Sequence, residues 1–259
     1  MDNNLLKKNA YINAWDKKQI HKNLENIIIP KNKEEAYNLQ SDYQKYSKHN
    51  LFGWKIAATS IEGQKHIGVS GPIAGRLIKE RLHKSVEKLS LLNNQMKVVE
   101  AEFSFQLNND MPKKNIPYNS QDVLNNIKHI CPAIEIPDSR FLNFHKIGEN
   151  LLIADNACAG EYVLGKNPIK SWKHIDLKSF KVDCYKNNQL VGYGLGSNVL
   201  GDPVKALTWL INELNLYNIT LYAGQTILTG TCIKPFEVKE GDQVVMDFYE
   251  LGKVNCRFS

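Results

Sequence analysis

The chain has 259 residues, of which 42% are hydrophobic and 23% are charged, as in an ordinary globular protein with a sizeable core. Lysine and arginine exceed aspartate and glutamate by 33 to 27, yet no basic block with interleaved aromatic residues is present, so we expect no nucleic-acid partner. The longest apolar runs fall far short of a membrane-spanning helix, and the N-terminal segment lacks the apolar core of a secretory signal. Five scattered cysteines without a Cys-x-x-Cys pair are typical of reduced thiols, so we expect a cytoplasmic protein with no membrane partner.

The start of the chain predicts a helical lead-in, residues 1–50, before a larger domain, residues 51–259. Apolar residues within residues 5–20 have a spacing compatible with a helix. Asn32 with a glutamate three residues later resembles a capping box, which predicts a second helix from there to about Ser47. We therefore expect these helices to pack on the main body of the protein.

The segment Leu51–Thr59 predicts a strand that carries a single lysine. Lys55 lies between Trp54 and Ile56, and no other charge occurs in the segment. A lysine on a strand most often faces solvent, but these apolar neighbours favour a buried amine. Burial would lower the pKa of the amine, which suits an acid or base in catalysis.

The segment Val98–Phe105, VVEAEFSF, predicts a strand with two glutamates on one face. Because side chains alternate along a strand, Glu100 and Glu102 point to the same side. Carboxylates held close together repel, so such a pair calls for a proton or a cation. An acidic face in contact with solvent is the simpler alternative for this segment alone.

A third glutamate favours the cation. The segment Ala133–Arg140 alternates around Glu135, and Pro137 predicts that the strand ends there. A carboxylate buried between apolar neighbours is costly unless it is paired. Three carboxylates without a nearby histidine or cysteine form an all-oxygen ligand set that suits Mg²⁺ or Mn²⁺ and leaves positions open for a substrate. Glu100, Glu102 and Glu135 are therefore the predicted metal ligands.

The other segments predict short strands and few helices. After a short helix we expect a flexible glycine-rich loop over Gly68–Gly75, then a helix over Gln121–Ile130, an apolar strand ending in a polar turn over Leu151–Gly160, and a hairpin over Ser179–Gly192. Asp202, followed by a proline, is the expected N-cap of an amphipathic helix. Without repeats or a βαβ alternation, the chain is predicted to be an α+β protein built on mixed sheets.

Six motifs in order resemble those of one family, and they span nearly the whole chain from about Leu51 onward. They are GWKIAATS, VVEAEFSF, AIEIPDSR, ADNACAG, GDPVKALTWL and ILTG. Together they resemble the 2-keto-4-pentenoate hydratase / 4-oxalocrotonate decarboxylase group of the fumarylacetoacetate hydrolase superfamily. The resemblance implies a mixed β-roll with a helical N-terminal region. It also implies homo-oligomers, or a complex with a related hydratase or decarboxylase.

The resemblance further implies a metal-dependent hydratase of aromatic compound catabolism. Mg²⁺ or Mn²⁺ would be held by the three glutamates, Lys55 would act as acid and base, and Asp155 would lie near the substrate. The implied substrate is a small anionic 2-oxo-enoic or 2-hydroxydienoic acid, to which water is added by way of a metal-bound dienolate. The alternatives are a decarboxylase or C–C bond hydrolase on the same scaffold, and an inactive partner subunit. The three retained glutamates argue against the inactive subunit.

Two places depart from the pattern of the well-known hydratases. An acidic residue is expected where this chain has Ile73, and serines are expected at Cys158–Ala159. Arg76 is a candidate for binding a distal substrate carboxylate, because a guanidinium suits bidentate recognition, although a surface arginine on a short helix is equally compatible. Asn156 and Ser139 complete the expected set of substrate-binding residues.

Overall fold

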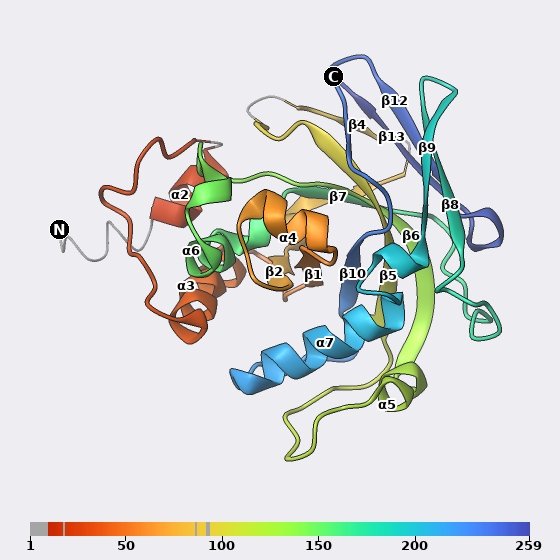
Figure 1. The fold of residues 1–259 in the computed structure, drawn as a ribbon, viewed down its shortest axis with the longest axis horizontal. Helices are drawn as coiled ribbons and strands as arrows, with labels where there is room; N and C mark the ends of the chain where they lie inside the picture. The colour runs from red at the N-terminus through yellow and green to blue at the C-terminus, as the bar shows by residue number, and fades with distance from the viewer. Residues whose placement is uncertain (1–9, 18, 86, 92–93) are drawn as a thin grey trace.

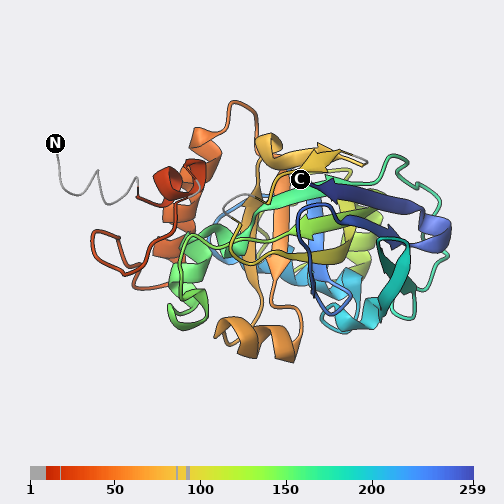
Figure 2. The same ribbon diagram turned by 90° about the horizontal axis from the view of Figure 1, so that it is seen from above.

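The computed structural model describes residues 10–17, 19–85, 87–91 and 94–259. Residues 5–9 and 18 of the first expected helix lie outside these ranges. Two mixed sheets lie side by side; the helices lie on the side of the larger sheet, and the smaller sheet forms the opposite edge of the molecule (Figures 1 and 2). No helix in the described part of the chain is long and apolar enough to cross a membrane. The predicted α+β class, with helices at the N-terminal end and a curled mixed sheet, is confirmed.

The larger sheet has eight strands in the order β2-β1-β10-β5-β6-β7-β3, with β11 paired to β5 beside this path. They are β1 (Gly53–Ala57), β2 (Ile73–Leu77), β3 (Leu82–Lys84), β5 (Val98–Leu107), β6 (Ile127–Ile136), β7 (Glu161–Leu164), β10 (Thr226–Thr231) and β11 (Phe236–Glu237). The smaller sheet, in the order β4-β13-β12-β8-β9, consists of β4 (Lys88–Leu89), β8 (Lys181–Lys186), β9 (Gln189–Leu195), β12 (Gln243–Asp247) and β13 (Lys253–Phe258).

The two faces of β5 have different surroundings, as its alternating sequence predicts. The ring of Phe103 packs edge to face against that of Phe248, next to β12, with 5.2 Å between centroids. The ring of Phe105 packs against that of Trp172 in a tilted arrangement, with 5.4 Å between centroids. Each such buried aromatic side chain contributes about 1.5–3 kcal/mol through burial of apolar surface. This apolar face joins the two sheets, and the glutamates of β5 therefore point away from the smaller sheet.

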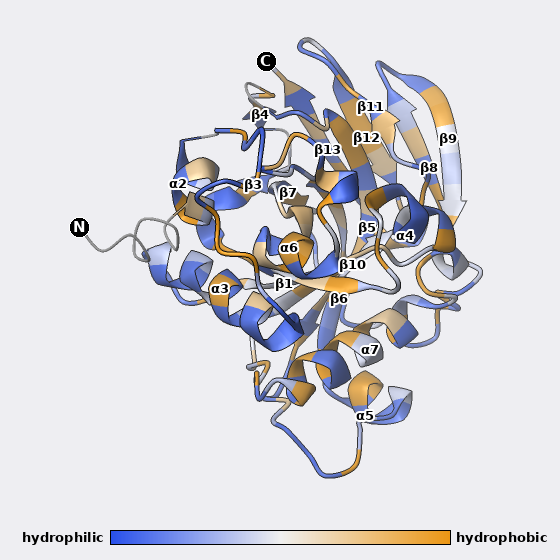
Figure 3. Cartoon of the chain, turned by 60° about the vertical axis from the view of Figure 1, so that its left-hand side comes forward, coloured by the Kyte–Doolittle hydropathy of each residue, from blue (hydrophilic) through white to orange (hydrophobic). Residues whose placement is uncertain are grey.

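The described part of the chain contains six α-helices: α2 (Ala10–Asp16), α3 (Lys33–Tyr46), α4 (Ile61–Ile67), α5 (Ser120–Asn125), α6 (Glu149–Ala154) and α7 (Pro203–Leu216). The predicted N-caps are confirmed, because Asn32 accepts from the backbone at the start of α3 and Asp202 does the same for α7. The hairpin is also confirmed, with Asn187 and Asn188 at positive φ in its turn. In Figure 3 hydrophobic residues gather along the strands, whereas the surface of α3 is largely hydrophilic.

Three predicted elements were wrong in type or extent. The apolar run in Leu151–Gly160 forms α6 and not a strand, because a short run of buried apolar residues suits either structure. The glycine-rich loop ends at Ile73, where β2 begins. The helix expected over Gln121–Ile130 ends at Asn125, because β6 begins at Ile127 and pairs with β5 as far as Leu107.

Helix α3 is joined to the sheet by one buried polar side chain. Gln40 has no exposed surface, and its amide nitrogen donates to the carbonyls of Ala74 in β2 and Ile153 in α6, both at 2.7 Å. Its amide oxygen accepts from the guanidinium of Arg76. The N-terminal helices therefore pack directly on the strands, and the division at residue 50 stays a prediction.

We predict that Gln40→Leu lowers the free energy of unfolding by about 2–4 kcal/mol, because two carbonyls and a buried guanidinium would lose their partner. Urea denaturation measures the loss. Gln44→Leu, on the exposed side of the same helix, is the matched control and should change stability by less than about 0.5 kcal/mol. Equal effects of the two substitutions would contradict the bridging role of Gln40.

Candidate active site and metal centre

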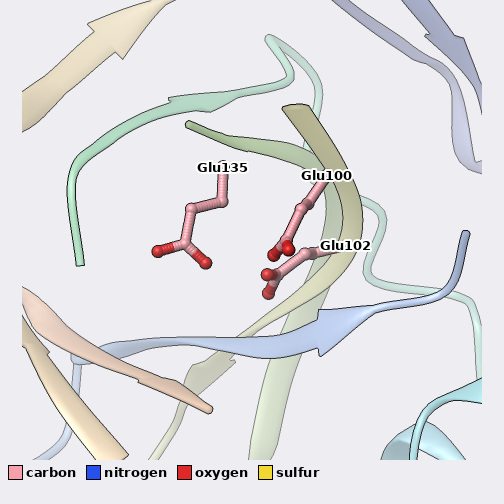
Figure 4. A group of neighbouring side chains, drawn as sticks. All are labelled: Glu100, Glu102 and Glu135. Carbon is pink, nitrogen blue, oxygen red and sulfur yellow. The ribbon is translucent and has the colours of Figure 1, made fainter. Parts of the chain in front are cut away.

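Three glutamates from two neighbouring strands converge on one point. Glu100 of β5 lies directly opposite Glu135 of β6 in the antiparallel register, and Glu102 is two residues further along the same face. One oxygen of each carboxylate lies within 4.8 Å of the others. Figure 4 shows the three side chains pointing toward one another.

The carboxylates are held where charge is costly. Glu102 and Glu135 are fully buried, and Glu100 is partly exposed. Burial and then the charge of Glu135 raise the pKa of Glu100 to about 7, and the same causes raise the pKa of Glu102 well above its usual value. Among the described residues, Glu102 Oε1 and both oxygens of Glu135 have no hydrogen-bond partner. This donor set fits a hard divalent cation, which would supply the missing partner.

The remaining oxygen of Glu102 is held by a glycine. The backbone N–H of Gly230 donates to Glu102 Oε2 at 2.8 Å. Gly230 has a φ of 91° within an irregularity of β10, and a Cβ there would lie 2.9 Å from the carbonyl oxygen of Ile56. Only glycine combines that conformation with that close approach. The ILTG motif therefore positions a carboxylate without contributing a side chain.

Lys55 lies at the middle of β1 and completes the cluster. Its Nζ is 3.1 Å from Glu135 Oε1 and 3.0 Å from the carbonyl oxygen of Ala157. Burial favours the neutral amine, but the charge of Glu135 and then that of the other two glutamates outweigh it, so the pKa of Lys55 is raised. The expectation of a lowered pKa was wrong, because it counted burial and left the carboxylates out.

The ADNACAG motif forms a tight turn that presents the Ala157 carbonyl to Lys55. Asn156, Ala157 and Cys158 have φ values of 60°, 51° and 57°, a left-handed run without glycine. The side chain of Asn156 accepts from the N–H of Arg76 at 2.6 Å and donates to its carbonyl at 2.8 Å. A Cβ on Gly75 would lie 2.3 Å from the carbonyl oxygen of Asn156, so the glycine makes room for the turn. Burial raises the pKa of the Cys158 thiol to about 12, which leaves it unreactive.

Asp155 is fully buried in a network of its own. Ser139 Oγ donates to Asp155 Oδ2 at 2.6 Å, and Arg140 Nε donates to Asp155 Oδ1 at 2.6 Å. Both carboxylate oxygens therefore have hydrogen-bond partners, whereas the carboxylate of Glu135 has only the ion pair with Lys55. Sequence reasoning did not single out Arg140, although it is the last residue of the AIEIPDSR motif. The roles expected for Asp155 and Ser139 at a substrate stay predictions.

Arg76 is not brought to the carboxylates. Arg76 of β2 pairs with Trp54, whereas Lys55 pairs with Gly75, so Arg76 and Lys55 lie on opposite faces of the sheet. Its guanidinium lies 4.6 Å from the centroid of the Trp54 ring and donates to Gln40. It is neither a surface arginine nor on a helix, and the observed contacts give it a role in packing.

The chain belongs to the fumarylacetoacetate hydrolase family: the model of the fumarylacetoacetate (FAA) hydrolase C-terminal domain matches residues 46–259. It is 31% identical over 231 residues to the 2-keto-4-pentenoate hydratase of Paraburkholderia xenovorans, covering 88% of this chain and 84% of the relative. It is 28% identical over 235 residues to the 2-oxo-hept-4-ene-1,7-dioate hydratase of Escherichia coli, covering 87% and 86%. The resemblance expected from the six motifs is confirmed.

Solved structures agree with this assignment. The 4-oxalocrotonate decarboxylase from Pseudomonas putida G7, complexed with magnesium and adipate, superposes with a TM-score of 0.87 at 26% identity, covering 98% of this chain and 97% of that one. The same enzyme complexed with calcium and acetate gives a TM-score of 0.85. The larger sheet and the N-terminal helices therefore follow a known fold over nearly the full length.

We predict that, with a chelator present, the free energy of unfolding rises as pH falls from about 8 to about 6. Glu100 and Glu102 have raised pKa values in the folded protein, whereas an unfolded glutamate titrates near about 4.3. In this window the folded state binds more protons, so falling pH stabilises it. Urea denaturation at several pH values across the window measures the free energy of unfolding, which we expect to rise by roughly 1–3 kcal/mol in total.

Glu102→Gln tests the same repulsion at a single site. We predict that the metal-free variant is more stable than the parent near about pH 8, because the amide oxygen still accepts from Gly230 without adding charge. Glu237→Gln, on the exposed end of β11, is the matched control and should be neutral. A less stable Glu102→Gln protein would contradict the account of the cluster.

Proposed function

We propose that the protein is a divalent-metal-dependent hydratase that adds water to a short 2-hydroxydienoic or 2-oxo-enoic acid. The observation that carries the proposal is the convergence of three carboxylates beside the ammonium of Lys55, with oxygens of Glu102 and Glu135 that lack a hydrogen-bond partner among the described residues. Relatives that cover most of the chain at 28–31% identity are hydratases of such acids, which supports the reaction class. We propose further that it works as a cytoplasmic homo-oligomer.

Glu100, Glu102 and Glu135 would hold Mg²⁺ or Mn²⁺, which supplies Lewis acidity toward the oxygens of a bound 2-oxo acid. Lys55 holds a proton at Nζ and is placed to exchange it with a substrate carbon next to the cluster. The Ala157 carbonyl fixes the direction of that ammonium. The partly exposed Glu100 marks the side from which a ligand reaches the otherwise buried set.

The predicted contributions of Asp155, Asn156 and Ser139 at the substrate remain part of this proposal. Their observed hydrogen bonds favour a role in shaping the turn beside Lys55. Binding of a distal carboxylate by Arg76 would require the substrate to reach the other face of the sheet, where the guanidinium of Arg76 lies over Trp54.

A decarboxylase on the same scaffold is the second candidate. The high TM-score to a 4-oxalocrotonate decarboxylase favours it. So does Ile73, a fully buried apolar residue at the position where an acidic residue was expected in a hydratase. Loss of CO₂ needs no activated water, so this substitution would not impair a decarboxylase.

The deciding experiment supplies purified protein and Mg²⁺ or Mn²⁺ with 2-hydroxypenta-2,4-dienoate and, separately, with 2-oxohex-3-enedioate. We expect loss of the dienoate absorbance with formation of 4-hydroxy-2-oxopentanoate, and EDTA should abolish it. Release of CO₂ from the diacid alone would replace the hydratase by the decarboxylase. No reaction with either compound would contradict both.

Two substitutions separate metal binding from proton transfer. We predict that Lys55→Met lowers kcat by about 10²–10⁴-fold while the protein still binds the cation, because only the proton donor is lost. Glu135→Gln should abolish cation binding, measured by calorimetry. Lys253→Met removes a lysine that forms an exposed ion pair with Asp247 and is the control for loss of a charge, with kcat unchanged. Loss of cation binding in Lys55→Met would contradict this division of roles.

A further inference from the structure

The direction of the Lys55 ammonium depends on a single neutral acceptor. Its Nζ has two polar partners among the described residues: the carboxylate of Glu135 and the carbonyl oxygen of Ala157. If Glu135 holds a cation, as proposed above, its charge is shared with that ion. The Ala157 carbonyl then becomes the contact that keeps Nζ in place.

That carbonyl lies in a strained backbone conformation that neighbouring groups must stabilise. Ala157 is the middle residue of the left-handed run between Asp155 and Ala159, and none of its three residues is a glycine. L-residues rarely adopt this conformation, so neighbouring groups must impose it. Asn156 is fixed from the side of β2 by its two hydrogen bonds to the backbone of Arg76.

The two ends of the run are fixed by one side chain. The guanidinium of Arg140 donates to the carbonyl oxygen of Asp155 before the run and, at 2.8 Å, to the carbonyl oxygen of Ala159 after it. Its Nε donates to the Asp155 carboxylate. Arg140 is only 4% exposed, so water cannot replace these bonds easily. A planar fork of donors is what allows one residue to bind three acceptors at once.

We propose that Arg140 is a positioning residue for Lys55. It clamps the backbone on both sides of Asn156–Cys158 and so aims the Ala157 carbonyl at the Lys55 ammonium. Arg140 touches neither Lys55 nor the three glutamates through any of these bonds. The kinetic part of this inference rests on the proposed function, whereas the geometric part does not.

The first test is Arg140→Lys. The lysine keeps a positive charge beside Asp155 but cannot reach both carbonyls and the carboxylate together. We expect kcat to fall at least about tenfold, with KM changed by less than about threefold and the dissociation constant of Mg²⁺ by less than about twofold. Arg81→Lys is the matched control: Arg81 is also ion-paired and lies over a tryptophan ring, but it does not contact the turn, and kcat should stay the same. An unchanged kcat in Arg140→Lys would overturn the proposal.

The second test needs no catalysis. In metal-free protein, the folding equilibrium constant is measured for Arg140→Lys, for Lys55→Met and for the double variant. If Arg140 acts on Lys55 through the turn, the double variant loses less than the product of the single losses, by about fivefold or more. If Arg140 only neutralises Asp155, the losses multiply to within about twofold, which would overturn the proposal.

Two precautions keep these outcomes distinct. If Arg140→Lys does not fold, Arg140→Gln combined with Asp155→Asn removes the charge pair without leaving an unpaired buried charge, and the same cycle is measured with Lys55→Met. If the parent protein is inactive on both acids, the proposed function fails. The metal-free cycle still decides whether Arg140 positions Lys55.

Discussion

Repulsion among three enclosed carboxylates is the constraint on which the rest of this structure depends. Glu100 and Glu135 face each other across β5 and β6 with Glu102 beside them, and Lys55 is the cation that approaches them. Such a cluster lowers stability, because burial and like charge both oppose ionisation. Its persistence in a well-packed sheet is best explained by a ligand that it binds. The two positive charges of a divalent cation and the one of Lys55 would balance the three carboxylates. The cation would then attract the negative charge of a substrate acid.

The backbone around the cluster contains energetically unfavourable conformations that serve the same site. Three non-glycine residues at positive φ, Asn156–Cys158, each cost of order 1–3 kcal/mol, and Gly230 occupies a position that no other residue fits. Both irregularities aim main-chain groups at the cluster: an N–H at Glu102 and a carbonyl at Lys55. The charged side chains are thus oriented by peptide groups, which do not titrate.

The sequence predicted what depends on local pattern. Alternation placed Glu100 and Glu102 on one face, and the motifs led to the correct family. It could not predict the cross-strand register that sets Glu135 opposite Glu100, because register depends on pairing between distant segments. The direction of the Lys55 pKa shift was also missed, because it depends on carboxylates that this register brings next to the amine. Arg140 was overlooked because its partners lie in a turn that the sequence predicted to follow a strand.

The same reasoning explains why hydratase and decarboxylase are hard to separate in this fold. Both reactions need a 2-oxo acid held by a cation and a proton placed beside it, and the cluster with Lys55 can serve either. A relative at 31% identity is a hydratase, while a closely superposing structure is a decarboxylase. Because the cluster can serve either reaction, we expect the choice between them to depend on residues just outside it. Ile73 is such a position, because it lies on β2 two residues before Gly75, the partner of Lys55, and presents a buried apolar side chain.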